Sequence, residues 1–204
     1  MFVGVNLCIL TVFFHIDILL QVWIYGGGFA SGSSALPLYD GKVLAAKAGV
    51  IVVSMQYRVG PLGFLSLGSE SAPGNAGLLD QQLAMRWVHD HIADFGGNPD
   101  MVTIVGESAG AASVSYHLLS DGSAELFRSA VMQSSTAGSP WAFVEPEVAK
   151  ERSYKLAELV RDDQICITVF YRTLQNELIG SSKTLQINVS QLFCYSRGKK
   201  SSSL

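Results

Sequence analysis

The chain has 204 residues, 49% of them hydrophobic and only 15% charged, which excludes a disordered tail or a coiled coil because both carry far more charge. Its net charge of −3 and sequence pI near 5.8 remove the electrostatic basis for nucleic-acid binding, which needs a clustered basic face. The mean hydropathy of +0.30 favours either one domain built on a buried parallel sheet or a membrane segment.

The two ends of the chain differ from its middle. Residues 1–21 are almost wholly apolar, but no Lys or Arg precedes Lys42 and no small-residue cleavage site follows, so they make a poor secretory signal. Asp17 interrupts a membrane helix. A pair of hydrophobic strands, a mis-assigned chain start and an uncleaved anchor all stay open. We expect an organised domain over 22–162 and an irregular tail over 163–204.

Four short apolar runs predict buried strands, because β-branched side chains pack well on a pleated sheet: 22–25, 51–57, 101–105 and 130–133. The helix predicted over 78–95 starts after Asn75, a plausible cap, and ends at Gly96. We expect its apolar repeat to face inward: Leu79, Leu83, Trp87, Val88, Ile92 and Phe95. Further helices are predicted over 109–119 and from Pro146 to about Arg161, the latter with Val148, Leu156 and Leu159 inside. Strands that alternate with helices indicate an α/β fold with a mostly parallel sheet.

The motif Gly106-Glu107-Ser108-Ala109-Gly110 follows the third strand and opens the second helix. A Gly-x-Ser-x-Gly match alone is weak, since a chain this long shows one by chance about 7% of the time. Its strand-to-helix context is that of a nucleophile elbow, in which a serine occupies a sharp, strained turn. The two glycines leave room for the neighbouring strand and helix. The sequence therefore predicts Ser108 as a catalytic nucleophile.

A second glycine motif, Tyr25-Gly26-Gly27-Gly28-Phe29, follows the first strand. Backbone N–H groups without side chains in the way can converge there on a developing oxyanion. The expected donors are the amides of Gly27, Gly28 and Ala109, the last being the residue after the nucleophile. Either motif alone would leave two unrelated glycine-rich turns as the better interpretation.

Together with Tyr57-Arg58-Val59-Gly60 and the run from Ala72 to Gln81, these motifs resemble the type B carboxylesterase/cholinesterase family. The resemblance runs from Val22 to about Val160, and Ser139-Pro140-Trp141-Ala142 leans toward the cholinesterase branch. It implies a partial α/β-hydrolase fold that lacks its C-terminal part. A fainter likeness over 172–179 extends it.

The resemblance also suggests roles for residues near the nucleophile. Glu107 would help to hold a cationic substrate, with a merely buried, hydrogen-bonded carboxylate as the alternative. Trp141 would line the acyl pocket, and Tyr39 and Phe29 would line the approach and attract a quaternary ammonium, unless these aromatics simply pack in the core. Arg58 and Asp80 resemble a structural ion pair, and we assign Trp23 and Trp87 to the core.

No histidine is well placed to serve as the base for Ser108. Members of the family use Ser, then Glu or Asp, then His, in that chain order. His117 follows Ser108, but it lies on the same helix, roughly 13 Å along the axis. His89 and His91 fall on the preceding helix and His15 in the apolar start. We therefore expect structural roles for all four, and little ester turnover by this chain alone.

The predicted function is a serine hydrolase of carboxylic esters, acting on a small-molecule ester and in the cholinesterase branch on a choline ester. The alternative is a non-catalytic, neuroligin-like adhesion relative. We expect no cofactor, no metal and no nucleic-acid partner, since three scattered cysteines (Cys8, Cys166 and Cys194) do not predict a zinc site and leave disulfide pairing open. The resemblance implies a secreted or cell-surface protein, with membrane association left open. The sequon at Asn188 lies in a stretch without other pattern.

Overall fold

The computed structural model describes residues 5–8 and 18–161. All the described strands and helices α1 to α4 belong to one compact unit, Val3–Glu151, whereas Arg152 and the residues after it belong to a second unit. The serine and tri-glycine motifs both lie in the first unit. The sequence features at residues 166, 172–179, 188 and 194 lie outside the described residues.

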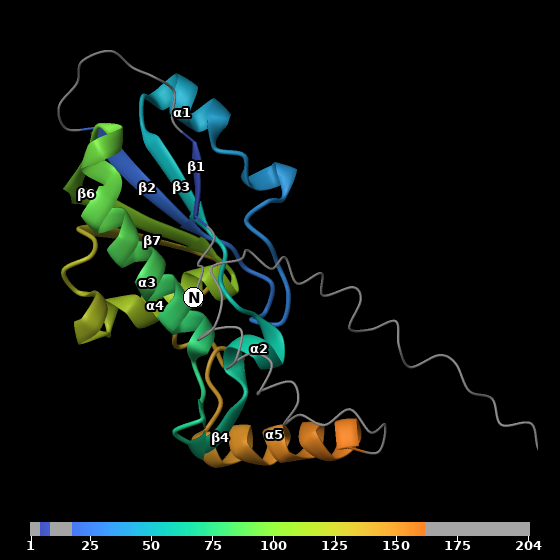
Figure 1. Cartoon of the computed structure of the whole chain (residues 1–204). Coiled ribbons are helices and arrows are strands. Elements are labelled where there is room, and N and C mark those ends of the chain that lie inside the picture. Colours follow the sequence, from blue (N-terminus) through green and yellow to red (C-terminus); the bar gives the residue numbers. More distant parts are fainter. Residues whose placement is uncertain (1–4, 9–17, 162–204) are drawn as a thin grey trace, which may run out of the picture. The chain divides into compact units, whose positions relative to one another are not determined.

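A five-stranded sheet forms the centre of the first unit (Figure 1), with strand order β1-β3-β2-β6-β7. The strands are β1 (Val5–Cys8), β2 (Ile18–Ile24), β3 (Ile51–Met55), β6 (Gly97–Glu107) and β7 (Ser129–Gln133). β2, β3, β6 and β7 pair in parallel, and β1 pairs antiparallel with β3. The expected α/β fold with a mostly parallel sheet is therefore confirmed, and two of the strands come from the apolar stretch at the start of the chain.

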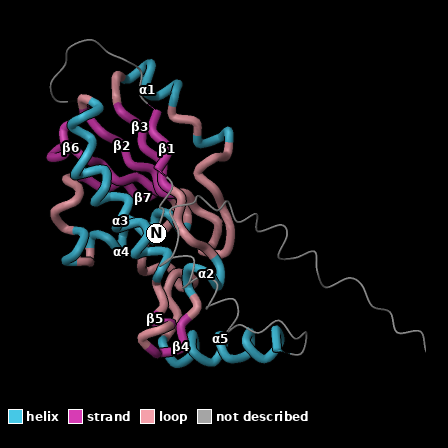
Figure 2. Tube along the Cα trace, viewed as in Figure 1, coloured by secondary structure: helices cyan, strands magenta, loops and turns pink. Residues whose placement is uncertain are grey.

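Helices connect the parallel strands, as crossover connections require (Figure 2). α1 (Lys42–Ala48) lies between β2 and β3, and α4 (Ala109–Leu118) between β6 and β7. The longer connection from β3 to β6 holds α2 (Gly60–Phe64), a hairpin of β4 (Ser66–Ser69) and β5 (Ala72–Pro73), and α3 (Ala76–His91). α5 (Pro146–Arg161) begins at the predicted proline. Within the described ranges no helix is long and apolar enough to cross a membrane.

The core consists of the predicted strand residues and the helix faces that cover them. Leu20, Val22 and Ile24 of β2 are at most 1% exposed. The same cluster contains residues of β3, β6, α3 and α4, including Val53, Ile104, Met85 and Val114, and Trp23 packs against it as predicted. Since both faces of its central strands are buried, this parallel sheet reads as continuous apolar runs in the sequence.

Helix α3 and the turn after it bury only part of the predicted apolar repeat: Val88 and Ile92 are buried, but the other four members are not. Leu79, Leu83, Trp87 and Phe95 are 37–55% exposed, so Trp87 is not a core residue. The buried positions are Gly77, Asp80, Gln81, Ala84, Met85 and Val88, followed by Ile92. The small residues let the helix approach the sheet closely, and the polar ones find partners inside. The prediction went wrong because it counted apolar side chains rather than fit and hydrogen bonding.

Two smaller expectations about helix ends also need correction. Asn75 occupies the N-cap position of α3, but its backbone is left-handed and its side chain makes no capping hydrogen bond. Val148 of α5, expected inside, is 39% exposed.

The ion pair expected from the resemblance is present. The Arg58 guanidinium donates from Nε to Asp80 Oδ2 at 2.7 Å and from Nη2 to Oδ1 at 2.8 Å, and the Arg58 backbone N–H donates to the same carboxylate. Asp80 is 3% exposed. The pair therefore ties the segment after β3 to helix α3.

A buried polar network joins α3 to α4 (Ala109–Leu118). His117 is 3% exposed, and its ring lies between Gln81 and Ser123, 3.0 Å from each. The Gln81 amide nitrogen donates to Ser113 Oγ at 3.1 Å, so its oxygen faces His117 Nε2, which must carry the ring proton. Burial lowers the pKa of His117 from 6.5 to about 4, so the ring is neutral near pH 7.

The first prediction concerns His117. In the unfolded chain it takes up a proton below about pH 6.5, but in the folded chain only near pH 4, so the free energy of unfolding should fall as the pH drops between these values. The loss should approach about 3 kcal/mol. Urea unfolding at several pH values measures it, and His117→Gln should flatten the dependence. Equal pH dependence in both proteins would contradict the assigned burial of a neutral ring.

The second prediction concerns the buried ion pair. Asp80→Asn should lower the free energy of unfolding by about 2–3 kcal/mol, because it leaves a partly buried guanidinium without its counter-charge. Asp40→Asn is the matched control, since Asp40 pairs with Lys42 at an exposed site and should cost less than about 1 kcal/mol. Equal losses in urea unfolding would refute the distinction.

Candidate active site

Ser108 occupies the sharp turn that the motif predicts. It lies between the end of β6 and the first residue of α4, with φ 54° and ψ −119°, a region that residues with a side chain seldom adopt. Its N–H donates to Gln133 O at 2.9 Å and its carbonyl accepts from the N–H of Ala112 at 3.0 Å. The sheet on one side and the helix on the other thus hold the strained conformation.

The glycines of the motif are required by close backbone contacts. A Cβ on Gly106 would overlap the carbonyl group of Gly110, and a Cβ on Gly110 would overlap the carbonyl oxygen of Ile24 in β2. The first turn of α4 therefore lies directly against the ends of β6 and β2. No other residue type allows this packing.

The tri-glycine segment lies beside Ser108. A Cβ built on Gly26 would be 3.0 Å from the Ser108 Cβ and 2.6 Å from the carbonyl oxygen of Glu107. The two motifs, about 80 residues apart in sequence, therefore meet at the carboxyl ends of adjacent parallel strands, where α/β folds place their sites. This is the juxtaposition that the sequence predicts.

A reciprocal tyrosine pair fixes the start of the tri-glycine segment. The Tyr25 hydroxyl donates to Tyr57 O at 2.9 Å, the Tyr57 hydroxyl donates to Tyr25 O at 2.7 Å, and the rings stack with centroids 4.4 Å apart. Burial raises the pKa of Tyr25 to about 12 and that of Tyr57 further still, so both hydroxyls keep their protons. The ends of β2 and β3 are thereby joined.

Three backbone amides next to the serine lack a partner in the regular secondary structure of the described residues, two of them in exposed glycines and one in the buried Ala109. Gly27 and Gly28 are exposed and have φ values of 120° and 62°. Their N–H groups have no hydrogen-bond acceptor within the described part of the chain. The N–H of Ala109 belongs to the first turn of α4, whose amides have no partner inside the helix.

The aromatic residues that we singled out separate into two groups. The ring of Phe29 lies 5.0 Å from that of Phe64 and 6.3 Å from that of Trp141, so Phe29 and Trp141 are brought together. Trp141 is 48% exposed, which is not core packing. Tyr39 instead packs against Trp23, with the rings tilted and their centroids 5.4 Å apart, beside the hydrophobic core.

Glu107 is half-buried at the end of β6, and its Oε2 lies 3.0 Å from the position of a Cβ on Gly26. No hydrogen bond or ion pair to its carboxylate is formed by the residues that the structure describes. A carboxylate in this position can accept a cation or a hydrogen-bond donor from a ligand.

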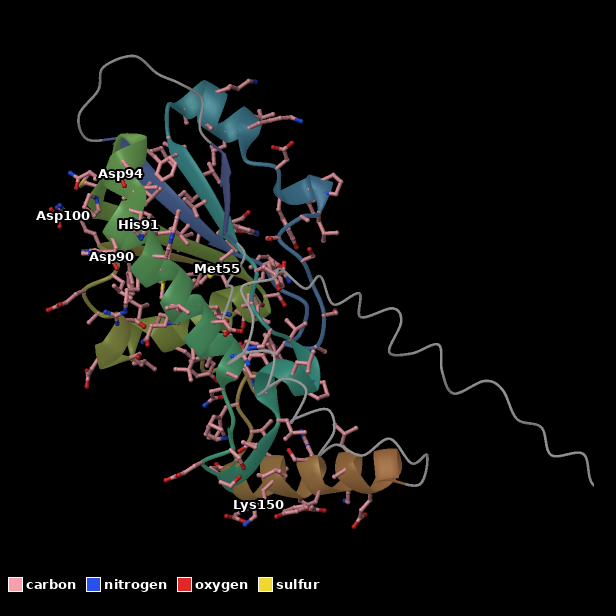
Figure 3. All side chains as sticks on the ribbon, viewed as in Figure 1. Met55, Asp90, His91, Asp94, Asp100 and Lys150 are labelled. Carbon is pink, nitrogen blue, oxygen red and sulfur yellow. The ribbon has the colours of Figure 1, made fainter. Side chains whose placement is uncertain are left out.

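The described histidines are not placed to accept a proton from Ser108. Both ring nitrogens of His117 are engaged in the buried network. His91 lies with Asp90 and Asp94 at the end of α3, and Asp100 is near the start of β6, the strand end opposite Ser108 (Figure 3). Among the described residues no cluster of His, Cys, Asp or Glu could hold a metal ion.

Sequence reasoning missed three residues of this region. Gly26 lies close to the serine, although we expected only Gly27 and Gly28 of this segment to take part. Phe64 joins Phe29 and Trp141. Ser113 donates from Oγ to the carbonyl oxygen of Ala109 at 2.9 Å. A polar residue within the apolar run 109–114 was the available signal for Ser113.

Comparison with known proteins agrees with this geometry. The model of the family described as "Carboxylesterase family" matches residues 20–189, which extends beyond the range in which we recognised motifs. An acetylcholinesterase of Myxine glutinosa is 50% identical over 175 residues, covering 84% of this chain and 52% of the relative. A cholinesterase of Mus musculus is 59% identical over 140 residues, covering 68% of this chain and 23% of the relative.

The chain thus spans between about a quarter and about half of these curated relatives. Another relative, cholinesterase 2 of Branchiostoma lanceolatum, is 57% identical over 141 residues, covering 69% of this chain and 42% of the relative. The family match covers well over half of the chain and contains the serine elbow and the tri-glycine segment. This chain belongs to the carboxylesterase family.

Proposed function

We propose that this chain provides the nucleophile and the oxyanion donors of a serine hydrolase that cleaves carboxylic esters. The observation that carries the proposal is the strained Ser108 turn with the tri-glycine segment beside it, where a Cβ on Gly26 would be 3.0 Å from the Ser108 Cβ. A purely structural turn needs neither a strained serine nor exposed amides next to it.

In the proposed reaction, Ser108 Oγ attacks the ester carbonyl carbon, and the carbonyl π electrons move onto its oxygen. The N–H groups of Gly27, Gly28 and Ala109 donate to that oxyanion, and each such donor contributes about 3–4 kcal/mol to transition-state stabilisation. When this tetrahedral intermediate breaks down, the bond between the carbonyl carbon and the alkoxide breaks. The alkoxide leaves with the proton from the serine, and the acyl group stays on Ser108 as an acyl-enzyme. Water then attacks the acyl group, which releases the acid and restores the serine.

The proton needs a carrier that the described residues do not supply. His117 is neutral and buried, with both ring nitrogens hydrogen-bonded, and no other described histidine lies beside Ser108. In the proposed enzyme the base and its acidic partner are therefore provided by other residues of the complete family fold. The chain alone should retain nucleophile and donors without efficient proton transfer.

The substrate that we propose is a choline ester. Several relatives carry the names cholinesterase or acetylcholinesterase. Glu107 offers a carboxylate beside the nucleophile that none of the described residues pairs with, and Phe29 and Trp141 offer a nearby aromatic surface, of which Trp141 would hold the acyl group. Tyr39 supports this less, since its ring packs against Trp23. We place the protein outside the cell or at its surface, on the family resemblance alone.

The third prediction tests the nucleophile. A fluorophosphonate probe should modify Ser108 in the complete family fold, in which the base is present, as shown by mass spectrometry of the labelled peptide, and Ser108→Ala should abolish the modification. Ser66→Ala is the control, because Ser66 is half-buried like Ser108 but belongs to the β4–β5 hairpin. Absence of labelling at Ser108 in the folded, complete family fold would refute the proposal and favour the non-catalytic, neuroligin-like alternative.

The fourth prediction tests the missing base. The chain alone should hydrolyse a small activated ester no faster than about 10³–10⁴ times the uncatalysed rate. This is the rate enhancement that remains when the triad is incomplete. Initial rates with and without Ser108→Ala measure it. Turnover comparable to that of an intact esterase, and lost in Ser108→Ala, would show that this chain contains its own base.

A further inference from the structure

A continuous chain of hydrogen bonds runs through the buried network and ends beside the nucleophile. Its start is Gln82 Nε2, which donates to Ser123 Oγ at 3.0 Å, and Ser123 Oγ lies 3.0 Å from His117 Nδ1. From the other side of the ring, His117 Nε2 donates to Gln81 Oε1 at 3.0 Å. The chain passes from α3 to α4 through the Gln81 side chain.

The last two bonds reach the residue after the nucleophile. Gln81 Nε2 donates to Ser113 Oγ at 3.1 Å, and Ser113 Oγ donates to the carbonyl oxygen of Ala109 at 2.9 Å. Gln81 and Ser113 are both 0% exposed. Each donor in this series of hydrogen bonds meets an acceptor, and all the bonds run in the same direction. The proton on the neutral His117 ring therefore fixes which group donates in each of them.

Ala109 is where this order matters for chemistry. Its carbonyl and its N–H flank the same α-carbon, so a bond that holds the carbonyl also restricts the direction of the N–H. The preceding residue, Ser108, is held in a strained conformation and would relax if the first turn of α4 could shift. A serine that bonds back to residue i−4 inside a helix is otherwise slightly unfavourable.

We propose that Ser113, held in place by Gln81, is a positioning residue for the reaction of Ser108. Its hydroxyl fixes the first turn of α4 and thereby aims the Ala109 N–H at the oxyanion. The inference rests on the proposed function, because it assigns a purpose to the Ala109 amide. Ser113 itself contacts neither the serine side chain nor substrate.

The test compares two buried serines at opposite ends of the network. Ser113→Ala removes the bond to Ala109, whereas Ser123→Ala breaks the network beyond His117, and both positions are 0% exposed. The rate of fluorophosphonate labelling at Ser108 should fall about tenfold or more in Ser113→Ala and less than about twofold in Ser123→Ala. Urea unfolding should show similar losses of stability in the two variants, since each hydroxyl has two buried partners.

Equal labelling rates in the two variants would overturn the positioning role and leave the proposed function intact. Absence of labelling in the complete family fold without either substitution would instead refute the proposed function, and hydrogen exchange then decides the positioning of the helix turn. The amide of Ala112, which donates to the carbonyl of Ser108, should exchange about tenfold faster in Ser113→Ala than in Ser123→Ala. Equal exchange at Ala112 would overturn the proposal.

Discussion

The structure depends on a close approach of three backbone segments at one edge of the sheet. The end of β2, the end of β6 and the first turn of α4 come together because Gly26, Gly106 and Gly110 have no side chain, and a Cβ at any of these positions would meet backbone atoms. The approach gives Ser108 its strained turn and places the tri-glycine segment beside it. The groups that it assembles are a hydroxyl and backbone amides, which suit attack on a carbonyl and stabilisation of the resulting oxyanion.

Buried polar contacts support this arrangement from three sides. The tyrosine pair joins the ends of β2 and β3, the Arg58–Asp80 ion pair joins the segment after β3 to α3, and the His117 network joins α3 to α4. The tyrosine pair and the His117 network are buried and the ion pair is part-buried, and each hydrogen bond has a defined partner and geometry. The elements around the nucleophile are thus tied to one another by directional bonds, in addition to the nondirectional packing of the core.

Much of the site was predictable, because its motifs encode local backbone geometry. The strand before Ser108, the helix after it and the tri-glycine turn all follow from short-range preferences for β-branched residues and glycine. The inward face of α3 was not predictable in the same way. Leu79, Leu83 and Trp87 form an apolar stripe that stays partly exposed, whereas the small Ala84 and the polar Gln81 are buried, because the Gln81 amide is satisfied by Ser113 and His117 of α4.

The amino-acid sequence by itself determined the α/β alternation, the nucleophile turn and the family, since each depends on residue types at fixed local spacing. Only the tertiary structure decided that Trp141 faces Phe29 while Tyr39 packs against Trp23, and that the His117 ring lies between Gln81 and Ser123. These outcomes depend on which strands become neighbours and on how closely helices approach them. Packing distances and buried hydrogen bonds set both, and they arise only when distant segments of the chain meet.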